Sequence, residues 1–214
     1  MSQKSNKIII ELYGLPGVGK STLARTLALE HGFFLVPSSS VSRFDYIVLS
    51  MRYPLMVGYW LLLIFKNYQV TKSIKHLRYN ISLLFMSLKK ILTAYRSKQL
   101  RVVVDEGLLQ RFLSCSDILL SKKDIARLVA CSPHGNFLVL VNDREVLHDR
   151  FTSSAHARAS EGETLLKQWR QNLKANLETL TPVIQCLSLT HFETKESSVD
   201  AILAQISSKN NTKF

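Results

Sequence analysis

The chain has 214 residues, of which 46% are hydrophobic, and it carries a formal net charge of +12. This length and composition suit one globular domain with a sizeable core and exclude a low-complexity chain. Three widely spaced cysteines without a C-x-x-C pair predict reduced thiols rather than a disulfide framework or a zinc site. The polar first residues argue against a secretory signal, so we expect a cytoplasmic protein.

The positive charge is concentrated in one segment. Between Asp45 and Asp105 there is no acidic residue, but there are ten of the 28 lysines and arginines, which leaves 18 basic residues against 16 acidic ones elsewhere. This segment must therefore face either an anionic partner or water.

The first third of the chain shows a strand, a helix and a second strand. Residues 7–13 are short, apolar and β-branched, which is typical of a buried strand. A helix is predicted from Lys20 to His31, with Gly32 ending it. Residues 33–36 then read as a second strand.

Two helices are predicted within the basic segment. Pro54 suits the first turn of a helix that continues to about residue 65. In residues 72–97, apolar side chains recur at alternating steps of three and four, which predicts a long amphipathic helix. We expect the two helices to pack together as a hairpin.

The rest of the chain continues the alternation of strands and helices. The predicted elements are a strand at 100–107, a helix at 122–131 with a capping box from Ser121 and Asp124, a strand at 137–141, a helix beginning near 143, a long helix over 163–180, a strand at 183–189 and a last helix near 197–207. Such alternation predicts a parallel sheet covered on both faces. The basic segment, about 46–100, is an insertion in this frame, so we expect one domain over 1–214.

The segment "GLPGVGKST" has the pattern of a phosphate-binding loop, and it lies where that mechanism requires, after a strand and before a helix. Glycines allow backbone N–H groups to approach a phosphate, and the following helix offers its positive end. Lys20 supplies a cation for the outer phosphates and the Ser21 hydroxyl is a ligand for Mg²⁺. The predicted nucleotide-binding residues are Gly14, Pro16, Gly17, Val18, Gly19, Lys20, Ser21 and Thr22.

Two carboxylates and several arginines are further candidates. Asp105 ends an apolar strand, where a carboxylate supports Mg²⁺ directly or through water. Glu106 either acts as a base, contacts an acceptor or is a solvated residue. Around a small, polar stretch, Arg144, Arg150 and Arg158 could close over a transferred phosphoryl group, and we favour Arg150 and Arg158.

On these motifs the chain resembles the P-loop nucleoside and nucleotide kinases of the thymidylate-kinase and adenylate-kinase group. The resemblance rests on "GLPGVGKST", on "VVVDEGLLQR" and on "LVLVNDREVLHDRFTSSAHAR". It implies a three-layer α/β/α fold with a five-stranded parallel sheet in the order 2-3-1-4-5 and a lid at about 144–163. It also implies ATP and Mg²⁺ as cofactors, Lys20, Asp105, Glu106, Arg150 and Arg158 as catalytic residues, and Ser21 and Asp105 as metal ligands.

The same resemblance implies transfer of the γ-phosphoryl group of ATP to a small acceptor bound by residues 37–100. The basic segment leaves the acceptor open. An anionic acceptor would be held by Arg43, Arg52 and Arg78. No aromatic and basic platform supports nucleic acid. The apolar run at 53–65 is too short to span a bilayer, so peripheral membrane contact, a dimer surface and plain core packing stay open.

Other classes of P-loop protein fit less well. A GTPase would need Asn-Lys-x-Asp and Asp-x-x-Gly, and residues 142–145 and 105–107 do not match these motifs. A P-loop ATPase, with Glu106 activating water, and a nucleotide-binding regulator without turnover stay as alternatives to a kinase.

Overall fold

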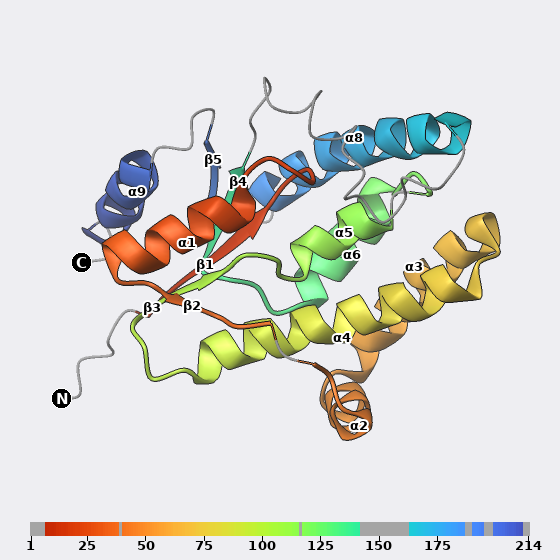
Figure 1. The fold of residues 1–214 in the computed structure, drawn as a ribbon, viewed down its shortest axis with the longest axis horizontal. Helices are drawn as coiled ribbons and strands as arrows, with labels where there is room; N and C mark the ends of the chain where they lie inside the picture. Colours follow the sequence, from red (N-terminus) through yellow and green to blue (C-terminus); the bar gives the residue numbers. More distant parts are fainter. Residues whose placement is uncertain are drawn as a thin grey trace.

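The computed structural model of the chain describes residues 7–38, 40–115, 117–141, 163–186, 190–194 and 199–211. A parallel sheet in the strand order β2-β3-β1-β4-β5 lies at its centre (Figure 1). The strands are β1 (Ile8–Tyr13), β2 (Phe34–Leu35), β3 (Arg101–Val104), β4 (Phe137–Val141) and β5 (Thr190–Thr194). The expected α/β class with a parallel sheet is confirmed.

Helices cover both faces of this sheet. In β4 every residue is buried, and in β1 all but the first, which requires cover on the two faces to which successive side chains point. The described helices are α1 (Lys20–His31), α2 (Arg43–Arg52), α3 (Pro54–Thr71), α4 (Ile74–Arg96), α5 (Leu109–Ser114), α6 (Lys122–Cys131), α8 (Glu163–Cys186) and α9 (Val199–Asn211). Helix α1 contacts β1, β2 and β3, and α4 also contacts β3.

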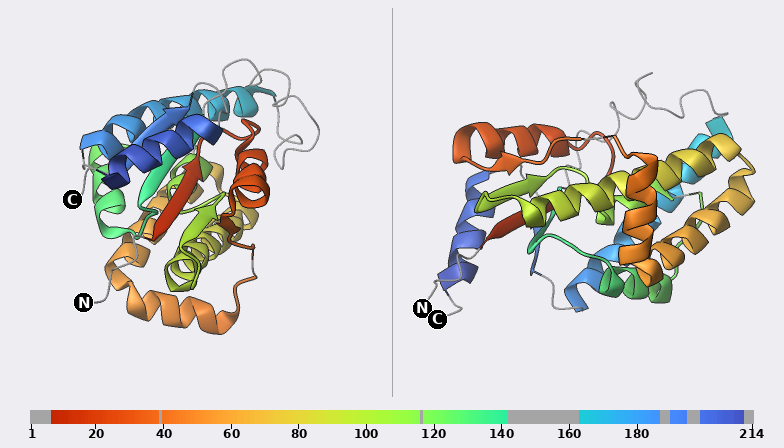
Figure 2. Two further views of the ribbon diagram at one scale, coloured as in Figure 1. Left: turned by 90° about the vertical axis from the view of Figure 1, so that its left-hand side faces the viewer. Right: turned by 90° about the horizontal axis from the view of Figure 1, so that it is seen from below.

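The helices of the basic segment form the hairpin that the sequence predicts. Helix α3 packs on α4, and it also contacts α6. The turn between α3 and α4 lies at the opposite end of the molecule from α9, whereas the C-terminal part of α4 reaches the sheet (Figures 1 and 2). There Ile91 and Ala94 pack with Val102 and Val104 of β3. The hairpin is therefore anchored to the sheet at one end only.

Helix α2 was not predicted, although the sequence carries a signal for it. The Ser42 side chain accepts a hydrogen bond from the Asp45 backbone N–H at 3.1 Å, and the Asp45 carboxylate accepts one from the Ser42 N–H at 2.8 Å. This is a complete capping box. At Ser121 the predicted cap is present as a bond from the Asp124 N–H at 3.1 Å.

The prediction for residues 181–189 was wrong. Helix α8 does not end at Thr181–Pro182 but continues through Pro182 to Cys186, and the fifth strand is Thr190–Thr194 rather than 183–189. Burial of Leu180, Val183 and Ile184 outweighs the loss of one helical hydrogen bond at the proline. The predicted helix near 143 lies outside the described residues.

No single described helix is both long and apolar enough to cross a membrane. Helices α2 and α3 reach the length and apolar composition of a membrane span only when they are taken together, and they are bent by 114° where they join.

Candidate active site

The predicted phosphate-binding loop connects the end of β1 to the start of α1. Its three glycines all have positive φ, at 148° for Gly14, 81° for Gly17 and 89° for Gly19. Side chains rarely adopt this region, so the loop needs glycine at these positions. At Gly14 a Cβ would also lie 2.4 Å from the carbonyl oxygen of Val141 at the end of β4, which leaves no room for a side chain.

The start of α1 suits a bound anion. Gly19 is the residue before the helix, and no acidic side chain occurs in the first turn. The unpaired N–H groups and the positive end of the helix dipole are therefore not opposed by a nearby carboxylate. Ser21 and Thr22 are exposed at this end, whereas Val18 is buried beneath the loop.

Lys20 lies inside the loop with its side chain only 6% exposed. Its Nζ donates hydrogen bonds to the carbonyl oxygens of Leu15, at 2.7 Å, and Gly14, at 3.1 Å. Burial lowers the pKa of Lys20 to about 8, and the positive charge of Arg111 contributes, while Glu106 and Asp105 oppose the shift. An ammonium group with a depressed pKa gains most when an anion arrives beside it.

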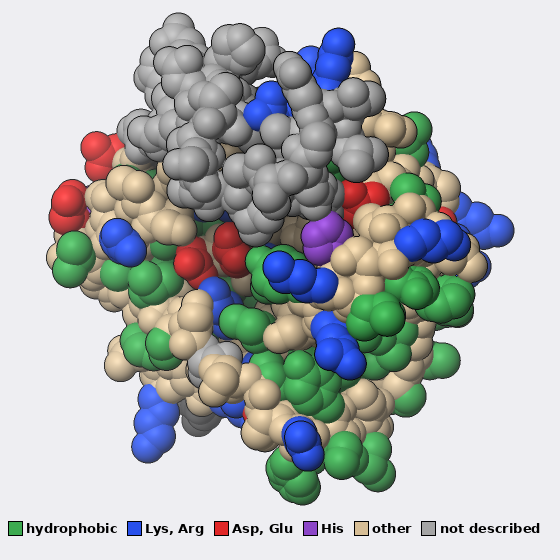
Figure 3. Space-filling view, turned by 45° about the vertical axis from the view of Figure 1, so that its right-hand side comes forward, with side chains coloured by type: hydrophobic (Ala, Val, Ile, Leu, Met, Phe, Trp, Pro, Cys, Tyr) green, Lys and Arg blue, Asp and Glu red, His purple; other side chains and the backbone are tan. Residues whose placement is uncertain are grey.

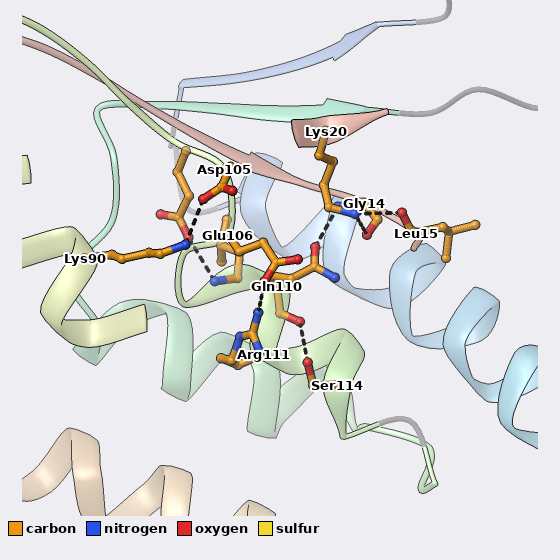
Figure 4. Close-up of polar contacts among 11 residues, drawn as sticks. Gly14, Leu15, Lys20, Lys90, Asp105, Glu106, Gln110, Arg111 and Ser114 are labelled. Carbon is orange, nitrogen blue, oxygen red and sulfur yellow. Dashed lines mark hydrogen bonds and ion pairs between the residues drawn. The ribbon is translucent and has the colours of Figure 1, made fainter. Parts of the chain in front are cut away.

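The two carboxylates that follow β3 each meet a cation from a different helix (Figure 4). Asp105 Oδ1 lies 2.8 Å from Nζ of Lys90 on α4, and Glu106 Oε2 lies 3.1 Å from a guanidinium nitrogen of Arg111 on α5. The two cations are almost fully buried, whereas Glu106 is 46% exposed. Both carboxylates are thereby held at the carboxyl edge of the sheet, next to the loop.

Neither cation was predicted as a site residue. Lys90 lies within the basic segment, where the sequence pattern of α4 does not distinguish it from its less buried neighbour Lys89. Arg111 is five residues beyond Glu106, and only the helical turn of α5 brings the two side chains together. The spacing between Glu106, just before α5, and Arg111 within it is the signal in the sequence that could have identified it.

A buried carboxylate on β1 holds the backbone that precedes α5 in place. Glu11 of β1 is fully buried, and its oxygens accept hydrogen bonds from the backbone N–H groups of Leu109, at 3.0 Å, and Gly135, at 3.1 Å. Burial raises the pKa of Glu11, opposed mainly by His134. At Gly107 a Cβ would lie 2.1 Å from Glu11 Oε1. Glu11 therefore fixes the start of α5, which carries Gln110 and Arg111.

A cavity of about 560 Å³ opens beside the loop. Helices α4, α5 and α8 line it together with the loop and Glu106. The lining residues are Pro16, Lys20, Lys75, His76, Tyr79, Asn80, Leu83, Glu106, Gln110, Arg111, Leu113, Ser114 and Trp169. Gln110 also accepts a hydrogen bond from the Gly14 N–H at 3.2 Å, which connects the cavity wall to the loop.

The structure thus brings only some of the predicted residues together. Lys20 and Glu106 line the same cavity, and Asp105 precedes Glu106. The cavity takes residues from the predicted acceptor region through α4, but Arg43, Arg52 and Arg78 are not among its lining residues.

The lid arginines fall outside the part of the chain that the structure describes. Arg144, Arg150 and Arg158 all belong to residues 142–162. Their role stays a prediction.

Within the described ranges, no three histidine, cysteine, aspartate or glutamate side chains lie together so that they could hold a metal ion. The predicted Mg²⁺ ligands are one hydroxyl and one carboxylate, Ser21 and Asp105, which are oxygen donors of the type that Mg²⁺ accepts alongside phosphate oxygens and water. This pairing stays a prediction.

No protein-family model matches the chain, and no curated protein matches it in sequence. Two solved structures of deoxyadenosine kinase from M. mycoides match its fold with a TM-score of 0.52 and 14% identity. One contains dCMP and dCDP, with 96% of this chain and 98% of that chain covered. The other contains dATP, with 95% and 99% covered. The chain therefore has the fold of a P-loop nucleoside kinase, as the sequence motifs predicted.

Proposed function

We propose that this protein is an ATP-dependent small-molecule kinase that transfers the γ-phosphoryl group of ATP to an acceptor bound in the cavity beside the loop. The proposal rests on the observation that the phosphate-binding loop and the end of β3 both contribute residues to that cavity. Lys20 of the loop and Glu106 from the end of β3 both line it. A volume of about 560 Å³ falls in the range of small-molecule sites.

In this proposal each group has one task. The loop amides and Lys20 hold the phosphates of ATP. The hydroxyl oxygen of the acceptor attacks the γ-phosphorus, and Glu106 accepts the proton of that hydroxyl. The bond between the γ-phosphorus and the oxygen that bridges it to the β-phosphorus breaks, and ADP leaves. The ion pair with Arg111 keeps Glu106 oriented toward the cavity. Ser21 and Asp105 would hold Mg²⁺, which neutralises phosphate charge when bound.

The acceptor class that we propose to test first is the nucleosides. Supporting this choice are the fold shared with deoxyadenosine kinase and a cavity that combines ring-bearing side chains, Tyr79 and Trp169, with amides. Lys75 adds positive charge to the lining, which also favours a phosphorylated acceptor such as a nucleoside monophosphate. Arg111 Nε is buried without a hydrogen-bond partner among the described residues, so an oxygen or nitrogen atom of the bound substrate could accept a hydrogen bond from it.

The test is ADP formation by the full chain with ATP and Mg²⁺, with and without a panel of nucleosides, nucleoside monophosphates and sugars. A kinase hydrolyses ATP slowly alone and forms ADP much faster with its acceptor. Fast hydrolysis without any acceptor would instead identify a P-loop ATPase. ATP binding without turnover under every condition would identify a regulator.

A variant pair tests whether the cavity holds the acceptor. Ser114→Phe fills the cavity, so it should raise the KM for the acceptor and leave ATP affinity unchanged. Thr93→Phe is the matched control. Both hydroxyls donate to a carbonyl oxygen one helical turn earlier, but Thr93 is exposed and does not line the cavity. Equal acceptor kinetics in the two variants would exclude this cavity as the acceptor site.

A further inference from the structure

Helix α2 exposes an apolar stripe instead of burying one. Phe44, Ile47, Val48 and Met51 follow the spacing of one helical face, and their exposed fractions run from 40% to 78%. Leu49 is the only buried residue of the helix. An ordinary surface helix has the reverse arrangement, so this stripe is not explained by packing within the chain.

Helix α3 continues the apolar surface after a bend of 114°. Leu55, Leu62 and Phe65 are more than half exposed and Leu61 is 38% exposed. A groove of about 730 Å³ opens here between α3 and α4, lined by Pro54, Leu55, Gly58, Tyr59, Leu61, Leu62, Ile64, Phe65, Leu77 and Ile81. We define the exposed apolar side chains of α2 and α3 as the apolar face.

The charged residues around the apolar face are mainly basic, although Asp45 on α2 pairs with Lys89 at 2.9 Å and Asp124 on α6 pairs with Lys66 at 3.3 Å. Exposed basic residues lie on the helices that carry or adjoin it, and no acidic residue occurs from 46 to 104. These basic residues are Arg43, Arg52, Lys66, Lys72 and Arg78. In a space-filling view, hydrophobic side chains gather over the lower part of the molecule, with lysines and arginines among them (Figure 3).

We propose that the apolar face docks the protein onto an anionic lipid surface. Charge complementarity selects this occupant: lipid headgroups of negative charge attract the basic border, and the apolar side chains enter the boundary between headgroups and acyl chains. A second copy of the chain is disfavoured because it would bring Arg43, Arg52 and Lys72 toward basic residues of its own kind.

The geometry favours a helix pair lying in the interface rather than crossing the bilayer. No single described helix passes the test for a span, and the bend between α2 and α3 prevents the pair from forming one straight rod. The face is also separated from the proposed acceptor cavity by α4, whose Leu77 and Ile81 line the groove while His76, Tyr79 and Asn80 line the cavity. Docking would therefore leave the cavity wall intact.

The experiment measures flotation of the full chain with vesicles of phosphatidylcholine alone and of phosphatidylcholine mixed with phosphatidylglycerol. We expect binding to the mixed vesicles, weak binding to phosphatidylcholine, and loss of binding in high salt because salt screens the charges. No association with the mixed vesicles at low salt overturns the proposal.

Two sets of variants test the two parts of the face. Leu55→Ser and Leu62→Ser should each lower vesicle partition about tenfold, because each removes an exposed side chain that lipid would bury. Arg43→Gln and Arg52→Gln should each lower it about fivefold on the anionic vesicles. Since all four side chains are exposed, the variants should melt as the parent does.

The matched controls are the single variants Arg25→Gln and Leu29→Ser on α1, where an arginine and a leucine are also exposed on one helical face. Both controls should bind vesicles as the parent does. Equal loss in the controls and in the corresponding variants of the face overturns the proposal. So does a dimer, detected by light scattering, that Leu62→Ser dissociates, because the face would then be covered by a second copy.

Discussion

The carboxyl edge of the sheet and the α2–α3 region place charge and apolar surface in opposite ways. At the sheet edge, Lys20, Lys90 and Arg111 are buried and engaged with carbonyl or carboxylate oxygens. In the α2–α3 region the cations are exposed, and so are the large apolar side chains. Burying charge and exposing apolar surface both cost stability. Each is therefore a sign of a surface shaped by a ligand rather than by folding alone.

The largest effect is expected for Lys20→Met, which removes one of the buried cations at the sheet edge. Transfer should fall roughly 1,000-fold, because a preorganised cation at the phosphates is lost. Folding stability should not fall, because the variant no longer buries a charge. Activity assays and thermal melts of both proteins at pH 7 measure these two effects, and a destabilised Lys20→Met protein would contradict the second.

The same variant isolates the pH dependence of Lys20. The folded pKa is about 8 against an ordinary 10.5, so between these values the unfolded chain holds more protons at this site. The contribution of Lys20 to unfolding free energy therefore rises with pH across this window. The difference in melting temperature between Lys20→Met and the parent should shrink from pH 8 to pH 10.

Glu11→Ala tests the buried support of the sheet edge. It leaves the N–H groups of Leu109 and Gly135 without their acceptor, which should cost about 3 kcal/mol. Chemical denaturation gives the value. Glu178→Ala on the exposed side of α8 serves as the control and should lie within about 0.5 kcal/mol of the parent. Equal stability of the two variants would exclude Glu11 as a structural anchor.

Glu106→Gln tests whether the carboxylate that lines the cavity acts as the base. The amide keeps a hydrogen-bond acceptor for Arg111 but no longer accepts a proton, so kcat should fall about 100-fold while ATP affinity persists. Stopped assays and calorimetry separate the two quantities. Glu30→Gln, exposed on α1, is the control. Unchanged transfer in Glu106→Gln would remove Glu106 from the site.

The smallest effect is expected in the α2–α3 region. Ser42→Ala removes the cap of α2 and should cost about 1 kcal/mol without changing transfer. Ser121→Ala on α6 is the matched control and should cost less, since the Ser42 hydroxyl also donates a 2.9 Å hydrogen bond to the Asp45 carboxylate, which Ser42→Ala removes as well. Denaturation curves of the pair measure the difference. A larger loss in Ser121→Ala would show that the hydroxyl–carboxylate bond of Ser42 contributes nothing to stability.

Sequence reasoning was strongest where structure depends on neighbours in the chain. The phosphate loop needs glycine at positions of positive φ, and the alternating strands and helices follow a local period, so both could be read directly. It failed at Pro182, because burial of Leu180 and Val183 decides that helix and burial depends on tertiary contacts. The partners Lys90 and Glu11 were missed for the same reason: their contacts span 15 and 98 residues.

Helix α4 serves two surfaces at once, and this limits how the protein can be altered. Residues 76, 79, 80 and 83 line the cavity, and residues 77 and 81 line the groove on the opposite side. A library that randomises the helix to change acceptor preference would also alter the groove unless 77 and 81 were held fixed. Engineering of one property without the other should therefore use α5, which lines the cavity and does not line the groove.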